Sequence, residues 1–218
     1  MDFKHTILAI FAGVALSLAP QGSRAGANSS GGGNIFVKQP GSSPVLLDLV
    51  VWQPDFVDDF TGSSGRSLRL VTFRSFENTE IARVRLTDQP AYWLLQEKLN
   101  LWKSASPIVI SAIEDALSSM EFYALRSGLK HQRGFSVPPV LRERYPQGVL
   151  VTAAAYGTNI NGAVISAPVW DSLGVFSQAG LIVHEALRDI QLGAVDEMPD
   201  EILQETAARI ILDVPHRG

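Results

Sequence analysis

The amino-acid sequence predicts an α+β fold: a single domain in which short strands and one β-hairpin pack with about four to five helices. Two observations support this prediction. Short β-rich runs bounded by turn residues occur early in the chain and again around residues 148–167. Segments with helical spacing of apolar residues lie between these runs and at the end of the chain. The C-terminal half is therefore expected to pack the hairpin against two helices.

The first 27 residues have the three parts of a secretory signal peptide. Lys4 and His5 form a mildly basic start, residues 7–19 are almost entirely apolar, and Ala25-Gly26-Ala27 provides the small residues that precede a cleavage site. The apolar run is shorter than the roughly 20 residues that a membrane-spanning helix needs. We therefore expect residues 1–27 to be removed and the protein to be exported, either to the periplasm or to the extracellular space.

Two regions are expected after the signal peptide. Residues 28–44 are rich in Gly and Ser, with three successive glycines at 31–33, and are predicted to be a flexible lead-in. Residues 45–214 are predicted to form the single globular domain, which is long enough to bury a core.

The strands are predicted from short patterns. Residues 45–52 (VLLDLVVW) form an apolar run that suits a strand or a first buried segment, and residues 67–73 alternate as a half-buried strand does. Residues 77–86 are ambiguous between helix and strand. Residues 148–155 and 163–167 are predicted to pair as a hairpin, with Asn161-Gly162 near its turn.

The helices are predicted from their first residues and their apolar spacing. They are expected over residues 90–103, from 107 toward a stop at Gly128, from 168 to a break near Gly174, over 177–192 and over 199–212. Ser106-Pro107 has the N-cap and first-turn pattern of a helix start. Trp93 and Trp102, at helical positions, are expected in the core rather than in a ligand groove.

Composition excludes several classes of function. The net charge is −4, and it becomes about −5 without the signal peptide, which carries Lys4, Arg24 and Asp2. A mildly acidic domain with scattered charges lacks the basic surface that binds nucleic acid. The chain has no cysteine, which excludes thiol catalysis and cysteine-ligated metals. No later stretch is apolar enough to predict an integral membrane segment after signal cleavage.

One helix carries the candidate chemistry. On a helical wheel over residues 177–192, the apolar side chains share a broad face, while Leu181 and Leu192 point almost the opposite way. The charged residues His184, Glu185 and Arg188 lie between and beside them. This pattern predicts a helix that is covered on both sides. Because partly buried charges are costly without partners, the three side chains are expected to form a polar cluster, with Glu185 and Arg188 paired.

The His184-Glu185 pair after an apolar run resembles the H-E-x-x-H helix of zincin metallopeptidases. In that helix, two histidines one turn apart bind zinc and the glutamate acts as general base. The resemblance implies that His184 is a metal ligand, that Glu185 is catalytic and that Glu205 on the next helix is an acidic third ligand. Arg188 replaces the second histidine and cannot ligate zinc. Glu205 is more simply explained as a partner of Arg209, one turn later.

A wider resemblance spans most of the mature chain. The Gly-rich start at Gly31-Gly32-Gly33-Asn34, the segment Leu46-Leu47-Asp48-Leu49 and the sequence from Ala179 to Arg188, which contains HEALR, are similar to a group of uncharacterised exported bacterial proteins. This resemblance implies export and a shared fold, and it implies no established activity.

The sequence therefore predicts an exported protein that is non-catalytic and acts through binding or association with the cell envelope, with no cofactor and an unknown partner. The alternative is a degenerate or atypical zincin-like metal-dependent hydrolase centred on His184-Glu185, with zinc as its cofactor.

Overall fold

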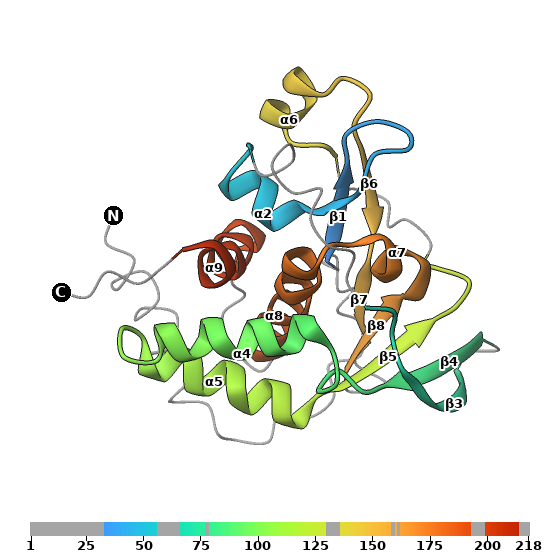
Figure 1. Ribbon diagram of the computed structural model, residues 1–218, viewed down its shortest axis with the longest axis vertical. Coiled ribbons are helices and arrows are strands. Elements are labelled where there is room, and N and C mark those ends of the chain that lie inside the picture. The colour runs from blue at the N-terminus through green and yellow to red at the C-terminus, as the bar shows by residue number, and fades with distance from the viewer. Residues whose placement is uncertain are drawn as a thin grey trace.

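The computed structural model describes residues 33–55, 66–76, 79–129, 136–157, 160, 162–192 and 199–213 (Figure 1). The predicted signal peptide and residues 28–32 lie outside these described residues. Over the described ranges, the chain forms a single α+β domain with seven helices and two small sheets, of three and five strands. This confirms the predicted fold class and gives more helices than the four to five expected.

The larger sheet has the strand order β3-β4-β5-β8-β7. Its strands are β3 (Leu70–Phe76), β4 (Thr79–Val84), β5 (Glu121–Leu125), β8 (Gly162–Ser166) and β7 (Ala154–Gly157). Neighbouring strands are antiparallel except β5 and β8, which run parallel from Glu121↔Gly162 to Leu125↔Ser166. A Cβ atom on Gly162 would lie 1.9 Å from the backbone oxygen of Glu121, so only glycine permits this close start of the parallel pair.

The smaller sheet has the order β2-β1-β6 and is antiparallel. Its strands are β2 (Val45–Leu46), β1 (Asn34–Val37) and β6 (Val149–Thr152). Strand β1 lies within the stretch that was expected to be a flexible lead-in, and Ile35 and Phe36 on it are buried. That expectation is wrong for these residues, because the segment NIFV supplies apolar area despite the Gly- and Ser-rich sequence around it.

The helix α8 (Val175–Leu192) lies at the centre of the fold. It packs against α4 (Pro90–Trp102), α5 (Pro107–Ser119) and α9 (Asp200–Leu212), and also against strands β2 and β7 (Figure 1). The short helix α2 (Leu47–Trp52) packs on α9 and α8. Two further short helices are α6 (Pro139–Arg144) and α7 (Ala167–Ser172). The elements around α8 thus come from both ends of the chain.

Several elements differ from the prediction in their bounds or type. Helix α5 ends at Ser119 rather than near Gly128, and the next residues form β5, because the apolar run EFYAL joins the sheet. Residues 47–52 form a helix instead of continuing the strand at 45–46. Residues 77–86 contain strand β4. The run at 148–155 divides: β6 pairs with β1, and only β7 forms the predicted hairpin with β8.

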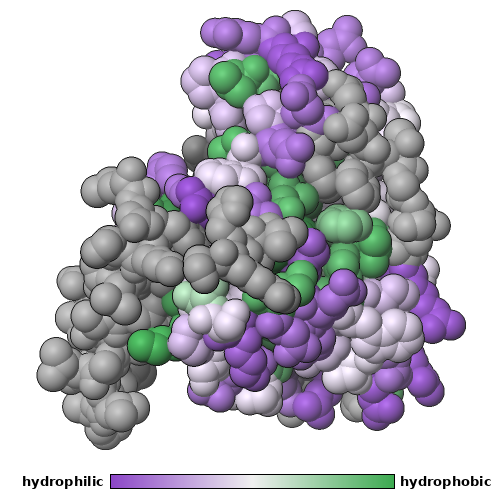
Figure 2. Space-filling view, turned by 60° about the vertical axis from the view of Figure 1, so that its left-hand side comes forward, coloured by the Kyte–Doolittle hydropathy of each residue, from purple (hydrophilic) through white to green (hydrophobic). Residues whose placement is uncertain are grey.

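The surface of the described residues contains both hydrophobic and hydrophilic side chains. Trp93 is 58% exposed, contrary to the expectation that it belongs to the core, whereas Trp102 is buried as expected. The indole nitrogen of the exposed Trp93 donates to the backbone oxygen of Thr87 at 2.9 Å. On the face drawn in Figure 2, hydrophobic residues emerge in small groups among hydrophilic ones.

Candidate functional site

The charged side chains of α8 are enclosed, as the helical wheel predicts. Every residue from Ser177 to Arg188 is buried, including Leu181 on the side opposite the main apolar face, while Leu192 at the end of the helix is exposed. The second cover comes from β2 and the start of α2, since a Cβ atom on Gly180 would lie 2.6 Å from Leu46. The Ser177 hydroxyl accepts a hydrogen bond from the Leu46 amide at 3.1 Å.

His184 contacts a carboxylate from the first helix of the domain. The distance between Nδ1 of His184 and Oδ2 of Asp48 is 2.7 Å, and the two side chains are 3% and 1% exposed. Burial by itself lowers the pKa of His184, but the charge of Asp48, its hydrogen bond and the charge of Glu185 together raise that pKa to about 9. At neutral pH this pair is therefore a buried ion pair that connects α2 to α8.

Glu185 contacts the backbone that leads into β1. Its Oε1 accepts a hydrogen bond from the Gly33 amide at 3.0 Å, and the residue is fully buried. Burial raises the pKa of Glu185, while His184, the Gly33 amide and Arg188 oppose that rise. Its second oxygen, Oε2, has no hydrogen-bond partner among the described residues. The carboxylate thus holds Gly33, the residue before β1, against the central helix α8.

Arg188 connects α8 to the last helix. Its guanidinium donates to Oε1 of Gln191 at 2.8 Å and to Oδ1 of Asp200 at 2.9 Å. Its positive charge also lowers the pKa of Glu185, so the two side chains interact electrostatically along the helix. Because Arg188 is buried and Asp200 begins α9, this contact fixes the start of α9 against α8.

A further polar contact joins α8 to the edge of the larger sheet. The hydroxyl of Tyr156 on β7 donates a hydrogen bond to Oδ1 of Asp189. Burial, together with the hydrogen bond to Asp189 and its charge, raises the pKa of Tyr156 well above its usual value. We define the polar cluster as Asp48, His184, Glu185, Arg188 and their backbone and side-chain partners. The contact between Tyr156 and Asp189 lies next to this cluster and connects α8 to the larger sheet.

The structure does not bring the zincin-like ligand set together. Glu205 pairs with Arg209 at 2.8 Å, as the spacing predicts, and its side chain is 44% exposed. Within the parts of the chain that the structure describes, no group of three His, Asp or Glu side chains could hold a metal ion. His184, Glu185 and Arg188 are near one another, as predicted, and Glu205 faces a partner on its own helix.

Sequence reasoning missed Asp48, Gly33, Gln191 and Asp200 as members of the cluster. Asp48 had a signal, because it is the single charge in the apolar run from Val45 to Trp52, and a charge in such a run needs a buried partner. Gly33 gave no such signal in the sequence, because it contributes a backbone amide, which every residue except proline has.

In comparisons with known proteins, no protein-family model, no curated protein and no solved structure matches this chain. Among the described helices, none combines the length and apolar character required to cross a bilayer. The cluster is therefore interpreted from its own geometry.

Proposed function

We propose that this chain is an exported, non-catalytic protein that acts by binding in the periplasm or outside the cell, and that the His184-Glu185 pair is part of its architecture. The observation that carries this proposal is the use of both side chains as internal connections. His184 binds Asp48 on α2, and Glu185 binds the Gly33 amide, so both are enclosed.

The position of Arg188 supports the same interpretation. It stands where a zincin-like helix has its second histidine, and its guanidinium offers no lone pair to a metal. Its contact with Asp200 connects α8 to α9, and its contact with Gln191 lies within α8. A helix on which His184, Glu185 and Arg188 each connect to a different element is typical of a buried structural network.

One observation favours the metal-dependent hydrolase as a second candidate. Metal-bound histidines commonly donate their other ring nitrogen to a carboxylate, and the contact of His184 with Asp48 has that form. For that candidate, Glu185 must reach a metal-bound water, and a third ligand must come from Glu205 or from another group. The bond from Gly33 to Glu185 and the pairing of Glu205 with Arg209 weigh against both requirements.

Elemental analysis separates the two candidates. The mature chain is purified without a His tag and without chelator, and zinc is measured per chain in wild type, in His184→Gln and in a control, Glu114→Gln, which changes an exposed ion pair with Lys103. Our proposal expects no near-stoichiometric zinc in any of the three. One zinc per chain that is kept in the control and lost in His184→Gln would overturn it.

A further inference from the structure

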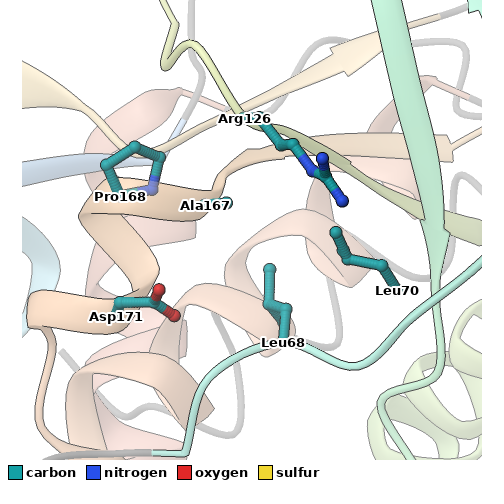
Figure 3. A pocket seen from close by; sticks show the side chains of 6 residues that line it. All are labelled: Leu68, Leu70, Arg126, Ala167, Pro168 and Asp171. Atoms are coloured by element: carbon teal, nitrogen blue, oxygen red, sulfur yellow. The ribbon is translucent and has the colours of Figure 1, made fainter.

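A cavity of about 400 Å³ lies at the larger sheet, and none of its lining residues belongs to the polar cluster (Figure 3). It is lined by Leu68, Leu70, Arg126, Ala167, Pro168 and Asp171. This volume is within the range of about 300–1,000 Å³ that is usual for small-molecule sites. Its walls come from the segment that leads into β3 and the first residue of that strand, from the residue after β5, and from helix α7.

The cavity lies at the carboxyl ends of the parallel strands. β5 and β8 end side by side at the register pair Leu125↔Ser166, so the next residues, Arg126 and Ala167, leave the sheet together. In open α/β sheets, ligands bind in the crevice outside the carboxyl ends of the parallel strands. The cavity has the equivalent position at the parallel pair of this mostly antiparallel sheet.

Two hydrogen bonds hold the segment that leads to one wall of the cavity. The indole nitrogen of the fully buried Trp170 on α7 donates to the backbone oxygen of Arg66 at 2.9 Å. The side-chain nitrogen of Gln89 donates to the backbone oxygen of Ser67 at 3.2 Å. Both bonds anchor the segment that carries Leu68, so the cavity is preformed and a ligand need not order it.

The lining combines an apolar surface with two opposite charges. Leu68, Leu70, Ala167 and Pro168 supply the apolar part. Figure 3 shows the guanidinium of Arg126 and the carboxylate of Asp171 on different sides of the cavity. A guanidinium matches the two oxygens of a carboxylate, whereas an aspartate accepts hydrogen bonds from an ammonium group.

From this arrangement we propose that the cavity binds a small zwitterion with an apolar side chain, an amino acid of the leucine type. The carboxylate of the ligand binds Arg126, its ammonium group binds Asp171, and its side chain packs on Leu68 and Leu70. This inference rests on the proposed binding function and names its ligand class.

The test uses L-leucine, leucinamide and N-acetylleucine as probes, titrated into the mature protein by NMR and calorimetry. Leucine is expected to bind saturably, while leucinamide, which lacks the carboxylate, and N-acetylleucine, which lacks the ammonium group, bind at least about tenfold more weakly. Arg126→Gln and Asp171→Asn are each expected to weaken leucine binding by about tenfold or more. The controls Arg142→Gln on α6 and Asp55→Asn keep the wild-type affinity.

Two results would overturn the inference: no saturable binding of leucine, or unchanged affinity in Arg126→Gln and Asp171→Asn. Since Arg126 and Asp171 are both exposed, their substitution is expected to leave the fold intact, which circular dichroism of each variant checks. The leucine titration reports on the cavity and the zinc measurement reports on α8, so the failure of this inference is distinguishable from the failure of the proposed function.

Discussion

The carboxylate of Asp48 lies 2.7 Å from the imidazole of His184, across 136 residues of sequence and with almost no exposure of either side chain. Through this contact, α2 is connected to α8 by charge as well as by apolar packing. A buried pair of this kind is costly to break from one side, because the remaining partner stays buried without compensation.

Removal of the Asp48 charge is therefore expected to destabilise the fold. Asp48→Asn should lower the free energy of unfolding by about 3 kcal/mol, measured by urea denaturation. The matched control is Asp55→Asn, which alters the exposed ion pair with Arg144 and should cost under about 1 kcal/mol. Equal, small losses in both variants would contradict the role given to Asp48.

The same pair predicts a pH dependence. Because the folded pKa of His184, about 9, is above its unfolded value of 6.5, the pair contributes its full stability below about pH 6.5. That contribution is lost as the pH rises through about 9. Urea unfolding followed over this range should show the loss in wild type and a much smaller one in His184→Gln. A flat difference between the two proteins across the range would show that His184 titrates as in the unfolded chain.

Substitution of Arg188 is expected to destabilise the fold at least as much as substitution of Asp48. Arg188→Ala should destabilise the fold by roughly 3–5 kcal/mol, because it removes a compensating positive charge from the fully buried Glu185 as well as the hydrogen bonds to Gln191 and Asp200. Arg69→Ala, which removes an exposed pair with Asp88, should cost under about 1 kcal/mol and serves as the control. Chemical denaturation measures the free energy of unfolding of both variants. A loss in Arg188→Ala as small as the loss in Arg69→Ala would contradict the structural role given to Arg188.

The contact from Gly33 to Glu185 is testable at a single amide. Hydrogen exchange at the Gly33 amide is expected to be slow in wild type and in Glu185→Gln, since a glutamine Oε1 still accepts the bond. In Glu185→Ala, exchange at Gly33 should become fast, and the unpaired amide should cost about 1–3 kcal/mol of stability. Slow exchange in Glu185→Ala would mean that other groups hold this part of the chain.

Processing of the N-terminus is predicted by sequence. Protein recovered from the periplasm or the medium should begin at Asn28, as shown by N-terminal sequencing. Ala27→Arg, which places a large charged residue at the cleavage site, should retain the whole precursor with Met1. Recovery of wild-type protein with an intact Met1 outside the cytoplasm would contradict the predicted signal peptide.

Local sequence patterns predicted a large share of the fold. Pro90 and Pro107 marked the starts of α4 and α5, and Pro199 marked that of α9 to within one residue, because the fixed φ and missing N–H of proline suit the start of a helix. Strand β5 was missed because EFYAL follows a strong helix without a break. Its strand conformation depends on hydrogen bonds to β4 and β8, which lie far away in the sequence.

The candidate site divides in the same way. The periodicity of α8 determined that His184, Glu185 and Arg188 share an enclosed region, since a helical repeat places residues on faces whatever the rest of the fold is. Only the tertiary structure decided which groups satisfy them: Asp48 from α2, the Gly33 amide and Asp200 from α9. The physical reason is that burial of a charge requires a partner, while the identity of that partner depends on which distant segments the core packs together.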